Sequence, residues 1–365
     1  MAKALKIFLG LIFLGLFLLP FGFIPLLDGV RFDIVDASTR LRFYLLKPYN
    51  AQSLRQRIEA PSPSWVQERL DEVKKLPSPR FEELTTFMNQ FSLQELEEKL
   101  LLVRITLVNG EIQTFPKGLK KFQGRLQAVL KALDFLNKEK LLPSHLDFIL
   151  CVNDKIFESY DGKIPIFAFS KNQDILTEKH LILIPDGMNL SRWAHTEPTI
   201  CFANFLFPWK NKHDKVVWRG SNTNLIREKA ASLPFSFLDA QITDGRNETY
   251  IIPELQIENK YLLSLDGISS TWPGFLWKLR SNSLVIKQRS PHVQWYYNGV
   301  QAGVHYIDVK ADLSDLEECY RWAQAHPMTV QLLVENAQKF TQEWVSYEAM
   351  LYYMAKIFQA YTKGS

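Results

Sequence analysis

Short apolar runs alternate with segments of helical spacing between residues 122 and 325, and this alternation limits the possible fold more than any other feature. Strands that alternate with helices are typical of α/β folds with parallel sheets. We therefore predict an α/β protein with two Rossmann-like halves, one for each series of strands. The first series comprises residues 148–152, 164–169, 181–184 and 216–218, and the second comprises 261–265, 283–287 and 305–309. Helical spacing occurs at 122–138, 223–232, 274–280 and 313–325.

The rest of the chain completes a five-part organisation. Ser92 followed by Glu95 is the pattern of a capping box, which supports helical structure before the first strands. We predict a membrane anchor at 7–27, a helical connecting segment at 28–100, a first Rossmann-like domain at 101–235, a second at 236–328, and a C-terminal helix at 329–365 that packs across both.

Residues 7–27 form a run without a charged side chain, preceded by two lysines and the amino terminus. About 20 apolar residues are enough to span a bilayer, so we predict an uncleaved N-terminal membrane helix. The alternatives are a buried core helix and a cleaved signal peptide, which normally has a shorter apolar core and a small-residue cleavage site. Orientation stays open, because three arginines after the run balance the charge before it, and two prolines near its end also permit a monotopic insertion.

Charge balance and cysteine usage argue against several classes of protein. The chain has 43 basic and 39 acidic residues, which gives no support for nucleic acid as a partner. Cys151, Cys201 and Cys319 lie far apart without a CxxC pair, which argues against a disulfide framework or a zinc site and favours buried thiols in a reducing compartment. Sequons at Asn189 and Asn247 matter only if the chain enters a secretory lumen.

Several common catalytic motifs are missing from the sequence. It contains neither GxGxxG nor GxxxxGK[ST], which argues against a dinucleotide dehydrogenase and a P-loop NTPase. GxSxG and D-x-D are absent too, and the seven histidines have no metal-ligand spacing. We therefore expect neither a metal ion nor a cofactor.

Two strand ends carry residues suited to binding a diphosphate. The strand at 216–218 continues into Arg219-Gly220-Ser221 and then into a helix that contains Arg227. Glycine lets the backbone approach a ligand, and a helix start offers N–H groups to an anion. An ordinary strand-turn-helix with an exposed arginine is the alternative. The second loop follows the strand at 261–265 and contains Asp266, Gly267, Ser269, Ser270, Thr271 and Trp272, with Lys278 in the next helix.

Asp154 follows the strand at 148–152 and is the candidate for a general base. A base must lie at the edge of a cleft, within hydrogen-bond reach of the hydroxyl that it deprotonates. The alternative is that Asp154 only forms a turn, as aspartate after a strand commonly does.

Five segments in this order resemble glycosyltransferase family 90, which includes capsule-associated proteins, bacterial lipopolysaccharide core transferases and Rumi-type protein O-glucosyltransferases. The resemblance covers residues 146–327. The segments are I-P-I-F-A-F-S-K at 164–171, W-R-G-S at 218–221, L-D-G-I-S-S-T-W at 265–272, S-N-S-L-V-I-K-Q at 281–288, and a run at 295–316 that contains W-Y-Y and H-Y-I-D-V-K.

This resemblance implies a GT-B fold, in which two Rossmann-like domains face a cleft, and inverting transfer of a hexose from an α-linked UDP-sugar without a metal ion. By position it implies that Asp154 is the catalytic base and that Ser221 and Arg227 hold the donor diphosphate. The complete set of expected donor-binding residues is Arg219, Gly220, Ser221, Arg227, Asp266, Gly267, Ser269, Ser270, Trp272 and Lys278.

The chain departs from the Rumi-type members in one loop and at its end. Those members carry a further arginine after the glycine, where this chain has Trp272-Pro273-Gly274. Lys278 is the expected substitute, unless it lies in solvent. Rumi-type members also have paired cysteines and a C-terminal retention signal, which this sequence lacks. The run W-P-G-F-L-W-K-L at 272–279 resembles the bacterial lipopolysaccharide branch.

Together these features predict a membrane-anchored hexosyltransferase that uses UDP-glucose or UDP-galactose. The expected acceptor is a glycolipid or glycan in lipopolysaccharide or surface-glycan synthesis. The expected location is the cytoplasmic face of a bacterial inner membrane, where an anchor confines the site to the plane of the acceptor. A lumenal protein O-glycosyltransferase and a catalytically inactive, membrane-tethered sugar-binding protein are the alternatives.

Overall fold

The computed structural model describes residues 51–244 and 249–363, and its parallel sheets and helices confirm the predicted α/β class. All of these residues belong to one unit, Lys47–Ser365. The predicted membrane helix at 7–27 and the first part of the connecting segment lie outside the described residues. Among the helices that are described, none combines the length and the apolar character that crossing a bilayer requires.

The first sheet has the strand order β2-β1-β3-β4-β6 and mixes two directions. β1 (Leu102–Val108) pairs antiparallel with β2 (Glu111–Phe115) and with β3 (Leu146–Cys151). β4 (Ile166–Ala168) and β6 (Leu181–Leu183) continue the sheet parallel to β3. The carboxyl ends of β3, β4 and β6 therefore meet at one edge of this sheet.

The second sheet is entirely parallel and has the order β12-β10-β9-β7-β8. β7 lies in this sheet beside β9. The chain therefore passes from the first sheet to the second between β6 and β7, and not at residue 236, which is the domain boundary predicted from the sequence. The order of strands along a chain does not show which sheet each one joins, so sequence alone misplaced this boundary. The strands are β7 (His213–Gly220), β8 (Leu238–Ile242), β9 (Asn259–Ser264), β10 (Leu284–Gln288) and β12 (Ile307–Val309).

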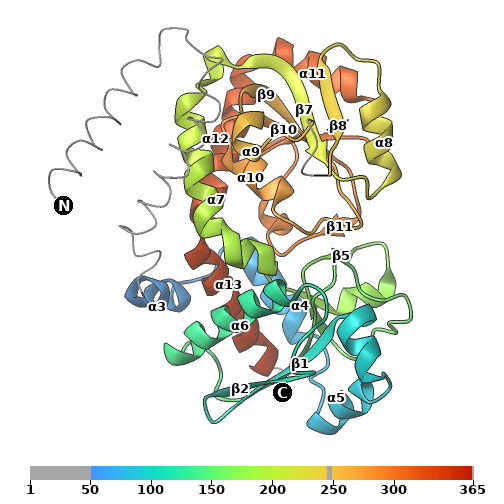
Figure 1. The fold of residues 1–365 in the computed structure, drawn as a ribbon. Coiled ribbons are helices and arrows are strands. Elements are labelled where there is room, and N and C mark those ends of the chain that lie inside the picture. Colours follow the sequence, from blue (N-terminus) through green and yellow to red (C-terminus); the bar gives the residue numbers. More distant parts are fainter. Residues whose placement is uncertain (1–50, 245–248, 364–365) are drawn as a thin grey trace, which may run out of the picture. The chain divides into compact units, whose positions relative to one another are not determined.

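Helices flank both sheets, and α7 (Gly187–Leu206) contacts helices of both halves (Figure 1). A second link is the antiparallel pair β5 (Lys171–Asn172) and β11 (His292–Val293). The capping box predicted at Ser92 and Glu95 is present and begins a π-helical turn, Glu95–Leu100. The other helices up to residue 325 are α3 (Ala51–Glu59), α4 (Ser64–Lys74), α5 (Phe81–Met88), α6 (Gln123–Lys138), α8 (Leu225–Ser232), α9 (Pro253–Gln256), α10 (Gly274–Arg280) and α11 (Leu316–Ala325).

The C-terminal stretch predicted as one helix at 329–365 is divided into two helices. α12 (Pro327–Trp344) packs against α10 and β10 of the second half, and α13 (Tyr347–Lys363) packs against α3, α4 and α6 of the first. One apolar core, which includes Phe148 of β3 and Val217 of β7, is continuous through both halves. Two further cores cover the opposite faces of the sheets, because successive strand residues point to opposite sides.

Candidate active site

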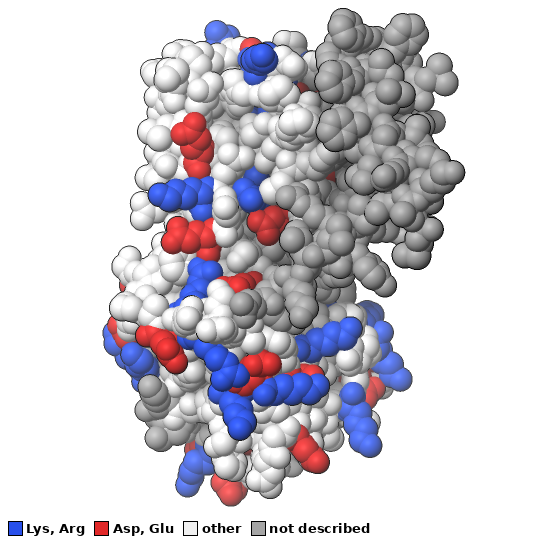
Figure 2. Space-filling view, turned by 90° about the vertical axis from the view of Figure 1, so that its left-hand side faces the viewer, with Lys and Arg blue, Asp and Glu red and all other residues white. Residues whose placement is uncertain are grey.

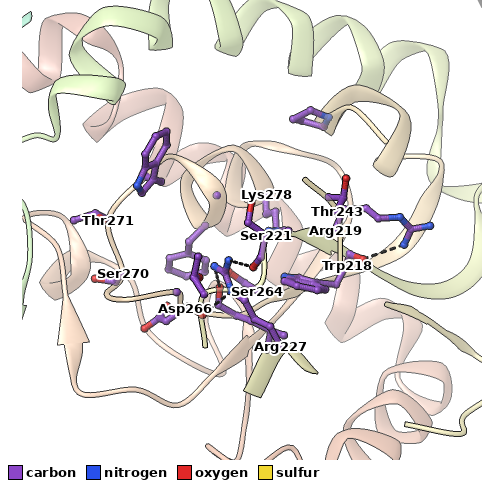
Figure 3. Close-up of a pocket in the computed structure, with 18 of the residues that line it drawn as sticks. Trp218, Arg219, Ser221, Arg227, Thr243, Ser264, Asp266, Ser270, Thr271 and Lys278 are labelled. Atoms are coloured by element: carbon purple, nitrogen blue, oxygen red, sulfur yellow. Dashed lines mark hydrogen bonds between the residues drawn. The ribbon is translucent and has the colours of Figure 1, made fainter. Parts of the chain in front are cut away.

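A cavity of about 470 Å³ is lined by residues from both halves of the described unit. Its walls are formed mainly by the loops after β7, β8 and β9 and by α10, and the loop after β3 adds one carboxylate. Figure 3 shows Ser221, Asp266 and Lys278 near Arg227 in this cavity. The cavity brings together all eleven residues singled out from the sequence: Asp154, Arg219, Gly220, Ser221, Arg227, Asp266, Gly267, Ser269, Ser270, Trp272 and Lys278.

Asp154 contributes the carboxylate on the first-half side of the cavity. Its Oδ1 accepts hydrogen bonds from Arg125 Nη1 and from Thr271 Oγ1, both at 2.8 Å. Its Oδ2 has no hydrogen-bond partner among the described residues, and the side chain is 13% exposed. The carboxylate is thus fixed through one oxygen, and the other is available to a ligand.

Arg125 holds a second carboxylate, that of Asp186 after β6. Arg125 Nη2 donates to Asp186 Oδ2 at 2.6 Å, and both side chains are almost completely buried. Asp186 also caps the start of α7, because its Oδ1 accepts from the backbone N–H of Met188 at 2.6 Å. Close packing makes this arrangement possible, since a Cβ on Gly187 would lie 2.4 Å from the backbone oxygen of Arg125.

The second-half side of the cavity has an excess of buried positive charge. On the face shown in Figure 2, Lys and Arg lie among Asp and Glu. Lys278 is only 5% exposed, and its ammonium group makes no hydrogen bond or ion pair with any described residue. Burial lowers the pKa of Lys278 to about 7; the charges of Arg227 and Lys287 add to this effect, and Asp266 opposes it. Lys287 itself is paired, at 2.8 Å, with Oδ1 of Asp266.

Arg227 reaches from α8 to the loops after β7 and β9 and bonds only to backbone carbonyl oxygens. Its Nη1 donates to Ser221 O at 2.8 Å and its Nε to Asp266 O at 2.9 Å. Burial lowers the pKa of Arg227, although a guanidinium stays protonated in proteins. Gly267 leaves room for this side chain, because a Cβ there would lie 3.0 Å from Arg227 Nη2.

Comparison with known proteins decides the family, because residues 94–364 match the model of glycosyl transferase family 90. The chain belongs to this family. It is 28% identical to protein O-glucosyltransferase 2 of Danio rerio over 42% of this chain and 34% of that protein. It is 25% identical to O-glucosyltransferase LpsA of Dichelobacter nodosus over 42% and 51%, and 23% identical to protein O-glucosyltransferase 1 of Homo sapiens over 55% and 57%. The matches thus span between a third and three fifths of these relatives.

Within this family 90 chain, some predicted donor residues already have partners in the protein. Arg219 donates to Asp239 Oδ2 at 2.8 Å and to backbone carbonyls, so its guanidinium ties β7 to β8. Ser269 Oγ and Thr271 Oγ1 lie 3.1 Å apart. Arg219 therefore borders the cavity mainly through its place on β7, whereas Lys278 brings its charge to it.

Two buried residues beside the cavity, Arg125 and Asp186, were not predicted from the sequence. Asp186 precedes a glycine at the end of an apolar run, a signal that could have marked a helix start at a strand end. Arg125 offers no such signal, because it lies within a helical segment like any surface arginine. Its place in the site appears only when α6 packs against the start of α7.

Proposed function

We propose that this family 90 protein is an inverting glycosyltransferase of GT-B type that transfers a hexose from a UDP-sugar to an acceptor hydroxyl. The supporting observation is one cavity in which the Asp154 carboxylate, with Oδ2 unbonded among the described residues, shares the lining with Lys278 and Arg227. Family membership and the O-glucosyltransferase names of the relatives support glycosyl transfer and favour UDP-glucose as the donor.

The donor side requires an anion for charge balance. Arg227 and Lys287 bring two positive charges, Lys278 adds a third when it is protonated, and among the described residues these side chains have one carboxylate partner, Asp266. A buried charge without a partner is costly, so a diphosphate that supplies two or more negative charges stabilises this region. The backbone at Gly220 and Gly267 approaches the ligand closely, since glycine has no side chain to keep it away.

The acceptor hydroxyl then reacts with the anomeric carbon. Asp154 Oδ2 takes the hydroxyl proton while the acceptor oxygen forms its bond to that carbon. The bond from the carbon to the β-phosphate oxygen breaks, and UDP leaves with the electron pair. Attack opposite to the leaving group inverts the configuration. Lys278 and Arg227 stabilise the charge that develops on the diphosphate, which is why the proposal includes no metal ion.

The acceptor and the location are further parts of the proposal. The apolar run at 7–27 supports a membrane anchor, and with it a glycolipid or glycan acceptor at the cytoplasmic face of a bacterial inner membrane. The relatives named protein O-glucosyltransferase favour a second candidate, a protein hydroxyl, as acceptor.

Replacement of Asp154 tests the proposed function. Purified protein is mixed with UDP-glucose and a bacterial glycolipid extract, and the release of UDP is followed. Asp154→Asn is expected to lower the rate by about 10²–10⁴-fold, the usual contribution of a general base, while UDP still binds. Asp134→Asn, an exposed change on α6, is the matched control. If wild type releases UDP no faster than Asp154→Asn although it binds UDP, the chain is a sugar-nucleotide-binding protein and not a transferase.

A further inference from the structure

Trp272 and Phe122 place two partly exposed aromatic rings beside Arg125, which donates a hydrogen bond to the proposed base. Trp272 is 42% exposed and Phe122 is 37% exposed. The ring centres lie 5.8 Å and 5.2 Å from the guanidinium carbon of Arg125, the residue that donates to Asp154. Exposed apolar side chains are ordinary when scattered singly, but two beside the arginine that holds Asp154 form a surface suited to a ligand.

Trp272 makes its polar contact with the first half of the protein, although it belongs to a loop of the second. Its backbone N–H donates to Asp186 Oδ2 at 3.3 Å, and its ring lies near Arg125 of α6. The residue also lines the cavity together with Asp154. It therefore lies between the cavity and the first half of the protein, beside the lining residue Asp154.

Both aromatic residues have a backbone conformation that favours glycine. The φ angle is +56° at Phe122 and +78° at Trp272. Bulky side chains rarely adopt this left-handed region, and residues held there are often parts of binding or catalytic sites. The chain thus has a large aromatic residue at two positions where glycine would adopt the backbone conformation with less strain.

We propose that Trp272 and Phe122 form the acceptor subsite and that this subsite binds a hexopyranose ring. The inference rests on the proposed function, because it takes Asp154 as the base. One face of a pyranose consists largely of C–H groups and packs against an aromatic ring, while the hydroxyls at its edge stay available for hydrogen bonds. A sugar held on these rings presents a hydroxyl to Asp154 Oδ2. The acceptor is therefore a saccharide and not a protein side chain.

Glycine substitutions test this subsite without straining the backbone. The probes are methyl β-D-glucopyranoside and methyl β-D-galactopyranoside, observed by saturation-transfer NMR with the full chain in the presence of UDP. Trp272→Gly and Phe122→Gly remove one ring each and suit the positive φ. Each is expected to weaken glycoside binding about tenfold, and Trp272→Tyr is expected to restore most of it. Lys140→Gly is the matched control, since Lys140 has φ +57° just beyond the other end of α6.

The outcomes separate this inference from the proposed function. Glycoside binding that is unchanged in both glycine variants overturns the subsite, and so does a wild-type protein that binds UDP but gives no glycoside signal. Saturable binding of a serine-containing peptide in place of the glycosides would assign the acceptor to proteins. A wild-type protein that binds no UDP contradicts the proposed function itself.

Discussion

The two sides of the cavity differ in how their buried charges are balanced. On the first-half side, Arg125 lies between Asp154 and Asp186, with ion-pair distances of 2.8 Å and 2.6 Å. On the other side, Lys278 has no ion pair with a described residue, and Arg227 bonds only to carbonyl oxygens. On the first-half side each of these charged groups has an ion-pair partner, whereas on the second-half side Lys278 has none among the described residues. Under the proposed function, the base is held in place before the donor binds, and the donor diphosphate supplies the counter-charge for Lys278.

Deleting one cation on each side is expected to change stability in opposite directions. Arg125→Met leaves the buried carboxylate of Asp186 and the partly buried one of Asp154 without their cation, so the free energy of unfolding should fall by about 3–5 kcal/mol. Lys278→Met removes a buried amine that has no hydrogen bond or ion pair with a described residue and lies 4.8 Å from the centre of the Trp277 ring, so the free energy of unfolding should stay level or rise by about 1 kcal/mol. Urea unfolding at pH 7 measures both values. Equal losses of unfolding free energy in Arg125→Met and Lys278→Met would contradict the difference between the two sides of the cavity.

Replacing Gly187 or Gly267 with alanine tests the same difference between the two sides of the cavity. In Gly187→Ala the new Cβ meets the backbone of Arg125 at 2.4 Å, and because backbone cannot yield easily, we expect a loss of about 1–3 kcal/mol. In Gly267→Ala the Cβ meets the side-chain ends of Thr223 and Arg227 at 2.8 Å and 3.0 Å. Those ends can move, so stability should change by less than about 1 kcal/mol while UDP binds more weakly. Thermal unfolding and UDP titration distinguish the two variants. A larger loss of stability in Gly267→Ala than in Gly187→Ala would contradict the assignment of Gly267 to the ligand-binding side.

The affinity for UDP should depend on pH through the donor side alone. The pKa of Lys278 is lowered to about 7, so above that pH the ligand-free protein must take up a proton before the ammonium can pair with a diphosphate. The second pKa of a terminal phosphate is about 6, so the charge of UDP itself changes little above pH 7. The association constant for UDP should fall by up to about tenfold per unit above pH 7. A constant affinity between pH 7 and pH 9 would show that Lys278 does not face the anion.

Thr271 joins the two sides, because its hydroxyl belongs to the donor loop and donates to Asp154. Thr271→Val removes this hydrogen bond, and we expect transfer to slow by about 3–10-fold, as the loss of 0.5–1.5 kcal/mol would cause. Thr271→Ser should restore the rate. Steady-state kinetics with saturating donor measures the effect, and a normal rate in the valine variant would make the contact incidental.

Much of the fold could be predicted because the evidence for it is local. Each of the seven predicted strands has a counterpart in the two sheets, since β-branched and apolar runs between turn residues indicate strands directly. The hairpin of β1 and β2 was missed, and so was α7, whose sequence contains Pro198 within the helix. Proline normally ends a helical pattern, and packing against both halves overrides that preference here.

The site, like the fold, could be predicted from the sequence where the evidence for it is local. A strand, a glycine, hydroxyl residues and a helix follow one another along the chain, so both loops that line the cavity could be found from sequence. The ion pairs around Asp154 join residues that are distant in sequence: Arg125 lies 29 residues from Asp154 and 61 from Asp186. Only the packing of α6 against the first sheet and α7 creates them. Without an alignment, no pattern in one sequence could indicate that pairing.

Calorimetric titration of UDP into wild type and Lys278→Met at pH 7 tests the central claim most directly. Lys212→Met is the matched control, because burial also lowers the pKa of Lys212 to about 7 but its ammonium group donates to Ser283 and a carbonyl and does not line the cavity. We predict that Lys278→Met binds UDP at least about tenfold more weakly than wild type, as expected for the loss of a buried charge pair, while Lys212→Met binds it normally. Equal affinity of wild type and Lys278→Met for UDP would contradict the account.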